Sequence, residues 1–97
     1  MYDALKNNNG FITVQEIFNR MRKFRPPDGE RYVVKRIPGR DFIQVGVSGF
    51  GETFKLFQLY AGNRDLYLYL RDMICQAADQ LKAACDVEEW HASQPSD

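Results

Sequence analysis

Few residues in this sequence have side chains that could carry out chemistry. Cys75 and Cys85 are the two cysteines, and His91 is the single histidine. A metal site needs several such ligands in one place, and a cysteine–histidine catalytic pair needs a pocket that holds both groups. His91 lies close to the C-terminus, in a stretch that we expect to be a tail. The sequence therefore predicts no catalytic residue, no metal ligand and no cofactor, and it favours a protein that is not an enzyme.

The two cysteines also indicate the redox environment. We expect both on one helix, where ten residues separate them by about 15 Å. A disulfide requires Cα atoms within about 7 Å, so these thiols should stay reduced. The polar, asparagine-rich residues 1–10 contain no apolar signal run, and no stretch approaches the length of a membrane span. We therefore expect a cytoplasmic protein that does not contact a membrane.

A glycine-rich run at residues 46–51 could suggest a phosphate-binding loop. Such a loop needs a helix directly after the glycines, so that backbone N–H groups point at the anion. Here Glu52 and a strand-like segment follow instead. The run is therefore interpreted as a hairpin turn.

Charge is unevenly distributed along a chain that balances 13 basic against 13 acidic residues. Residues 20–40 contain two acidic residues and eight basic ones, namely Arg20, Arg22, Lys23, Arg25, Arg31, Lys35, Arg36 and Arg40. Residues 72–97 are strongly acidic. Four aspartates, at positions 65, 72, 79 and 86, recur every seven residues, which places them along one side of a helix. These patches either dock a partner or are solvated surfaces that pair locally, and the sequence leaves both interpretations open.

The first predicted element is a helix over residues 13–24. Thr13 and Glu16 have the spacing of a capping box, and Ile12 and Ile17 that of a hydrophobic staple. Apolar residues then recur at helical spacing as far as Met21. The prolines at positions 26 and 27 require the helix to end before them.

Three strands are predicted next, at residues 31–37, 42–48 and 53–60, with short turns that favour an antiparallel order. The third strand has an irregular alternation, since Phe54 and Leu56 share one face whereas Phe57 and Leu59 share the other. Either a bulge switches the register or both faces are partly covered.

A long helix is predicted over residues 64–86, with Asn63 as its N-cap. The alternating segment Leu66 to Leu70 could also be a strand, but its spacings fit the helix. The chain should then form one domain, with a polar lead-in at residues 1–12, a folded core at 13–86 and a flexible tail at 87–97. The predicted fold is α+β, in the order α-β-β-β-α, with a three-stranded antiparallel sheet and two helices packed on one face.

This arrangement leaves the other sheet face open. If Ile43, Val45, Val47, Phe54 and Leu56 face the helices, aromatic residues remain for the outer face. We therefore predict a non-enzymatic protein-binding module, such as an adaptor, an inhibitor or a small subunit. The predicted contact residues are Arg22, Lys23, Arg25, Tyr32, Arg36, Arg40, Phe42 and Phe57. Two copies of the chain could also pair through this face, and with a different strand register the rings would simply be core.

The alternative function is nucleic-acid binding through the basic segment 20–40. The α-β-β-β-α order is that of double-stranded-RNA-binding domains, in which a lysine-rich start of the second helix grips phosphates. Here the corresponding residues 63–66 are Asn, Arg, Asp and Leu, and the pI is near 6.6. The likeness therefore stops at the order of the elements, and protein binding is favoured.

Overall fold

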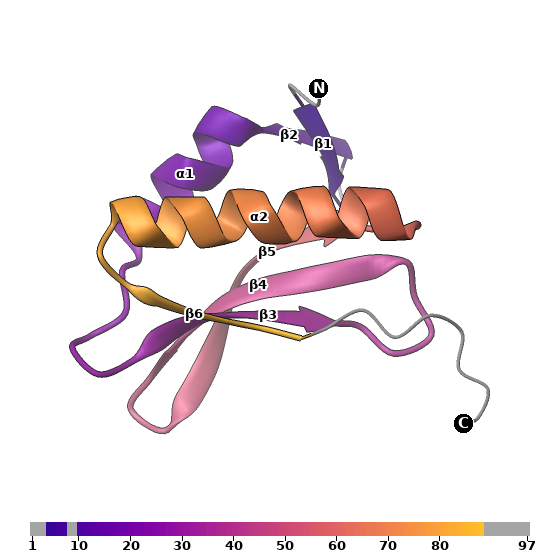
Figure 1. The fold of residues 1–97 in the computed structure, drawn as a ribbon. Helices are drawn as coiled ribbons and strands as arrows, with labels where there is room; N and C mark the ends of the chain where they lie inside the picture. The colour runs from indigo at the N-terminus through magenta and orange to yellow at the C-terminus, as the bar shows by residue number, and fades with distance from the viewer. Residues whose placement is uncertain (1–3, 8–9, 89–97) are drawn as a thin grey trace.

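Two helices lie on the same face of a four-stranded sheet, and a two-stranded hairpin precedes them (Figure 1). The computed structural model describes residues 4–7 and 10–88. The elements are β1 (Ala4–Asn7), β2 (Gly10–Thr13), α1 (Val14–Lys23), β3 (Arg31–Arg36), β4 (Phe42–Gly49), β5 (Glu52–Tyr60), α2 (Arg64–Gln80) and β6 (Ala84–Val87). The fold is α+β as predicted, but the sheet is not the predicted three-stranded antiparallel one.

Helix α1 begins and ends where the sequence predicts. The Thr13 side chain accepts a hydrogen bond from the Glu16 backbone N–H at 3.1 Å, which caps the first turn. Ile17 and Met21 are buried, and the helix ends at Lys23, before the two prolines. Helix α2 likewise begins after Asn63, whose Oδ1 accepts from the Leu66 N–H at 2.8 Å.

Helix α2 ends six residues earlier than predicted, and the chain then forms a fourth strand. Lys82 has a φ of 57°, and the Ala83 N–H donates to the Ala78 carbonyl at 2.9 Å. These are the features of a Schellman motif, which usually has glycine where Lys82 stands. Because no glycine or proline marks this helix end, the apolar periodicity alone extended the prediction to residue 86.

Strand β6 pairs in parallel with β3 at the edge of the sheet, in the order β5-β4-β3-β6. Ala84 lies opposite Arg31 and Val87 opposite Val34, and the Glu88 N–H donates to the Val34 carbonyl at 2.9 Å. The predicted tail at 87–97 is therefore wrong for Val87, and residues 89–97 lie outside the described part of the chain. The pairs β3–β4 and β4–β5 are antiparallel, as predicted.

The described residues of the predicted polar lead-in, 4–7 and 10–12, contribute Leu5 and Ile12 to the core. Strands β1 and β2 form an antiparallel hairpin in which Leu5 pairs with Ile12, and both side chains are buried. Residues 8 and 9, between these two strands, lie outside the described part of the chain. Two strands of four residues each were too short to show an apolar period.

The irregular third strand contains a β-bulge at Leu56. Phe57 lies opposite Val45 and Lys55 lies opposite Gly46, so Leu56 is the extra residue on β5. A Cβ on Gly46 would lie 2.6 Å from the Phe54 carbonyl oxygen, so glycine is required at this close approach. The Arg20 Nη1 donates to the Leu56 carbonyl at 3.4 Å, which ties α1 to the bulge.

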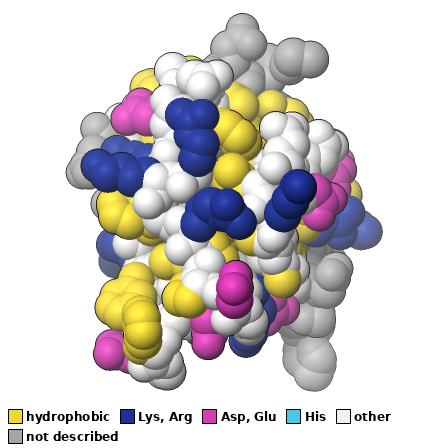
Figure 2. All heavy atoms as spheres, turned by 90° about the vertical axis from the view of Figure 1, so that its left-hand side faces the viewer, with side chains coloured by type: hydrophobic (Ala, Val, Ile, Leu, Met, Phe, Trp, Pro, Cys, Tyr) yellow, Lys and Arg dark blue, Asp and Glu magenta, His cyan; other side chains and the backbone are white. Residues whose placement is uncertain are grey.

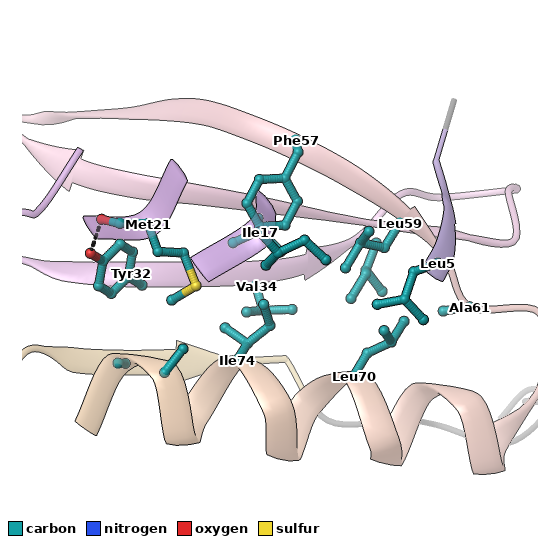
Figure 3. Packing of buried hydrophobic residues seen from close by; sticks show 14 of the residues in the cluster. Leu5, Ile17, Met21, Tyr32, Val34, Phe57, Leu59, Ala61, Leu70 and Ile74 are labelled. Carbon is teal, nitrogen blue, oxygen red and sulfur yellow. Dashed lines mark hydrogen bonds between the residues drawn. The ribbon is translucent and has the colours of Figure 1, made fainter. Parts of the chain in front are cut away.

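The bulge brings Phe54, Phe57 and Leu59 to the same face of the sheet, toward the helices. The expectation that Phe57 and Tyr32 lie on an open outer face is therefore wrong. Phe57 is 5% exposed and Tyr32 is fully buried, with its hydroxyl donating to the Met21 carbonyl (Figure 3). The helix-facing side of the sheet, the two helices and the hairpin together enclose one hydrophobic core.

The face of the sheet away from the helices is mainly polar. Lys35, Gln44 and Gln58 occupy its middle positions, and Phe42 is half-buried there, edge-on to Tyr60 with ring centroids 5.9 Å apart. Within the described residues, neither helix is long and apolar enough to cross a membrane.

Candidate functional site

The predicted contact residues do not form one surface. Arg22, Lys23 and Arg25 are exposed around the C-terminal end of α1. Arg36 is the last residue of β3, about 17 Å along the strand from its first residue, Arg31, and Arg40 lies in the turn that follows. Tyr32 and Phe57 are in the core, and Phe42 adjoins Arg36 and Arg40 at the β3–β4 turn. The group at the end of α1 is the candidate site, because Lys23 and Arg25 line a hollow there.

The row of four aspartates predicted along one side of a helix is likewise shorter than predicted. Asp65, Asp72 and Asp79 are exposed on α2, whereas Asp86 lies on β6 and its Oδ2 is 3.4 Å from Arg31 Nε. In α1, Arg20 and Glu16 form another exposed pair at 3.5 Å. Each exposed pair contributes between about 0 and 1 kcal/mol to stability. Some of the basic segment therefore pairs locally, which was one of the two interpretations of the charge pattern.

Beside the C-terminal end of α1 lies a hollow of about 640 Å³ that we name the aromatic–basic groove. Its lining joins the end of α1 and the following loop to the β4–β5 hairpin. The residues are Lys23, Phe24, Arg25, Pro27, Val47, Ser48, Gly49, Phe50, Phe54, Lys55 and Leu56. The groove exists because β4 and β5 continue beyond the point where α1 stops, so the helix-facing side of the sheet is uncovered there (Figure 1).

Three phenylalanines of this groove are exposed to an unusual degree. Phe24, Phe54 and Phe50 are 48%, 47% and 89% exposed. Large apolar side chains grouped at a surface usually mark an interaction site, whereas single ones do not. Figure 2 looks onto this end of the molecule and shows hydrophobic surface with Lys and Arg side chains, and some Asp and Glu side chains, around it.

Phe50 occupies a strained backbone position. The β4–β5 hairpin has a two-residue loop, Phe50-Gly51, with φ angles of 54° and 80°. Positive φ at both central residues is typical of a type I′ turn, where Asn-Gly is the favoured pair. A bulky residue in the left-handed region costs roughly 1–2 kcal/mol. Strain of this kind is concentrated at functional sites, where the side chain is needed.

The charged residues of the groove all have one sign. Lys23, Arg25 and Lys55 line it, and its lining includes no aspartate or glutamate. The Lys23 ammonium lies 5.5 Å from the centre of the Phe24 ring. Lys55 Nζ lies 3.3 Å from Gln58 Oε1, on the sheet face away from the helices, so Lys23 and Arg25 supply the charge at the groove. The groove is thus apolar at its base and positive at its rim, which suits a ligand with apolar groups and negative charge.

The sequence reasoning found Lys23 and Arg25 but missed the aromatic residues beside them. Phe50 was interpreted only as part of a turn, and Phe54 was assigned to the core. One signal was present, because a phenylalanine between two glycines in a tight turn has no neighbours that could bury it. Phe54 gave no such signal, since its exposure depends on where α1 ends in space.

The two cysteines lie on different elements, in contrast to the prediction that one helix carries both. Cys75 is on α2 and Cys85 is on β6, and both side chains are half-buried. Burial, the adjacent Cys75 thiol and the nearby Asp86 and Asp79 raise the pKa of Cys85 to about 12. The single helix from which a separation of about 15 Å was derived is therefore wrong, because the chain turns back after α2.

Metal binding finds no support in the residues that the structure describes, since no three His, Cys, Asp or Glu side chains converge there. His91 lies outside these residues.

Comparison with protein-family models, with curated proteins and with solved structures finds no match for this chain.

Proposed function

We propose that the chain is a non-enzymatic protein-binding module whose aromatic–basic groove holds an acidic segment of a partner protein. The observation that carries this proposal is Phe50, which is almost fully exposed on a backbone position that disfavours it. A turn that served folding alone would gain stability from asparagine at this position. A ligand-contacting role accounts for a phenylalanine there.

The chemistry of the groove supports the choice of partner. Phe24, Phe50 and Phe54 offer three rings to apolar side chains, and aromatic and arginine residues are those most enriched at the centres of protein interfaces. Lys23 and Arg25 add positive charge without an acidic counterpart in the lining. We therefore expect the bound segment to combine aromatic or aliphatic anchors with aspartate or glutamate.

Single-stranded nucleic acid is the competing ligand, because bases stack on exposed aromatic rings in positively charged grooves. The whole chain carries no net charge, and α2 presents Asp65, Asp72 and Asp79 to solvent. With Arg64 and Arg71 on the same helix, α2 carries three acidic and two basic residues, a net charge of −1, which does not attract a long polyanion. A short acidic segment, by contrast, can be confined to the groove. Protein binding is therefore the proposed function, and nucleic acid is an outcome that the experiment must distinguish.

A display library of random peptides tests the proposal with the intact chain as bait. We expect the enriched peptides to contain Asp or Glu together with Trp, Phe or Leu. Binding of one synthetic enriched peptide, measured by fluorescence anisotropy, should weaken at least about tenfold in Phe54→Ala and in Phe50→Asn. Lys23→Ala should weaken binding less, and its effect should shrink as salt is added.

Phe11→Ala provides the matched control, because Phe11 is 75% exposed on β2 and does not line the groove. This variant should bind the peptide like the unchanged chain. The proposal is overturned if enriched peptides bind Phe54→Ala and the unchanged chain equally well. It is also overturned, in favour of nucleic acid, if an oligothymidine binds more tightly than any enriched peptide and loses affinity in the same variants.

A further inference from the structure

The aromatic–basic groove is open along one edge of the sheet. On the side toward β4 the loop after α1 closes it, because Pro27 packs against Gly49, with its Cδ 3.3 Å from the position that a Cβ there would take. On the other side lies β5, which is the outermost strand in the order β5-β4-β3-β6. A segment that occupies the groove therefore lies next to the backbone of β5.

Part of this β5 edge has backbone groups without a partner strand. The two-residue loop of the hairpin makes its flanking residues, Gly49 and Glu52, a hydrogen-bonded pair, and such pairs then alternate along the strand. Phe54 therefore points its N–H and C=O toward β4, whereas Thr53 and Lys55 point theirs away from it. In the part of the chain that the structure describes, no other backbone or side-chain group pairs with these outward groups.

The rest of the β5 edge is already engaged by other elements. The Leu56 carbonyl accepts from Arg20 Nη1 at 3.4 Å, so α1 contacts the edge at the bulge. Beyond the bulge the N-terminal hairpin lies beside β5, with Lys6 Nζ 5.2 Å from the centre of the Tyr60 ring. The open part of the edge is therefore short, and it coincides with the part of β5 that lines the groove.

On the basis of the proposed function, we propose that the acidic segment of the partner binds as an extended strand that pairs with β5 at Thr53 and Lys55. These two residues offer two N–H donors and two C=O acceptors to an added strand. In this mode of recognition main-chain hydrogen bonds supply affinity, and pockets for alternate side chains supply specificity. Every second side chain of the added strand then projects over Phe54 into the groove.

Charge selects an acidic strand over a second copy of this chain. Two copies paired through β5 bring Lys23 and Arg25 of one groove close to the same residues of the other, and these like charges repel. An acidic strand instead brings carboxylates to Lys23 and Arg25. Its side chains on the opposite face approach Lys55, whose ammonium lies on the side of the sheet away from the helices.

The first test uses one synthetic peptide that the display library enriches, bound to the intact chain. In a set of peptides that each carry one N-methylated backbone amide, methylation should weaken binding about tenfold at every second position and less than about twofold at the positions between. The apolar anchors of the peptide should lie two residues apart, whereas a helical ligand places them three or four apart.

The second test changes the edge itself. Thr53→Pro removes an outward N–H without removing a hydrogen bond to β4, and proline is tolerated at an edge where the N–H faces solvent. This variant should bind the unmodified peptide about tenfold more weakly. Thr53→Val is the matched control, because it keeps the N–H and Thr53 does not line the groove. It should bind the peptide like the unchanged chain.

The outcomes separate this proposal from the proposed function. If the peptide depends on Phe54 but N-methylation shows no alternation, or if folded Thr53→Pro binds as tightly as Thr53→Val, the added strand is ruled out and the groove remains the binding site. If light scattering shows a dimer that Thr53→Pro abolishes, the edge belongs to a second copy, which also overturns the proposal. If no enriched peptide depends on Phe54, the proposed function fails and the added strand with it. The methylated peptides are tested on the unchanged chain, so they decide the question even if Thr53→Pro fails to fold.

Discussion

Phe57 and Phe54 lie on the same strand and face the same side of the sheet, yet they have different surroundings. Phe57 is 5% exposed and packs in the core with α1, whereas Phe54 is 47% exposed and lines the aromatic–basic groove. The bulge at Leu56 brings both rings to the helix-facing side. What separates them is the end of α1, which covers one ring and stops before the other.

The comparison shows that a helix end can decide whether an apolar residue serves folding or recognition. Helix α1 stops at Lys23 because two prolines follow shortly after, and the chain must leave the sheet surface there. The strands continue, and the part of the sheet that the helix does not cover becomes the base of the groove. The same residue type at two adjacent sites can therefore be tested for two different roles.

The largest expected effect is at the covered ring. Phe57→Ala should lower the free energy of unfolding by about 3–5 kcal/mol, because it removes a buried ring and leaves a cavity. Phe54→Ala, the matched variant at the open end, should lower it by less than about 1 kcal/mol, because its ring keeps much of its contact with water. Urea denaturation measures both. Equal losses in the two variants would show that the groove is part of the core.

An effect of opposite sign is expected at Phe50. Phe50→Asn should raise the free energy of unfolding by about 1 kcal/mol, because asparagine is accommodated in the left-handed region and favours the type I′ turn. The same denaturation experiment measures it, and the variant should bind the groove peptide more weakly. Phe50→Ala serves as the control, since it removes the ring without relieving the backbone strain. If Phe50→Asn is no more stable than Phe50→Ala, the strain argument is wrong.

The smallest effect near neutral pH is expected from the buried thiol. Burial raises the pKa of Cys85 from its usual value of 9.0 to about 12, so the folded chain keeps a proton that the unfolded chain releases. The free energy of unfolding should therefore be unaffected below pH 9 and should fall as the pH rises from about 9 toward 12.

Denaturation at several pH values checks this window in the reduced protein. Burial also raises the pKa of Tyr32, so the free energy of unfolding of Cys85→Ala should still fall to some extent at high pH. The free energy of unfolding should nevertheless fall less steeply with pH in that variant than in the unchanged chain. An unchanged slope would mean that Cys85 does not carry the effect.

Local signals in the sequence predicted the elements whose ends they mark. The Thr13 cap and the prolines at 26 and 27 located α1, and turn residues located β3, β4 and β5 to within a residue or two. The end of α2 was predicted six residues too late, because Lys82 has the left-handed backbone conformation in which glycine is usual. Most of strand β6, which has four residues, was wrongly predicted as the last part of this helix.

The candidate site was predicted only in its charges. Lys23 and Arg25 were identified from their place in a basic segment, but the rings beside them were assigned to the turn or to the core. Their exposure depends on the bulge at Leu56 and on the length of α1 relative to the hairpin, and neither can be derived from the alternation of β5 alone.

The sequence by itself determined where most elements begin and end, since capping side chains, prolines and glycines act within a few residues of themselves. The tertiary structure decided which residues meet. Arg31 pairs with Ala84, and Tyr32 with Cys85, after the chain has reversed direction. Such contacts depend on the combined packing of the sheet, the bulge and both helices, and no local pattern in the chain contains that information.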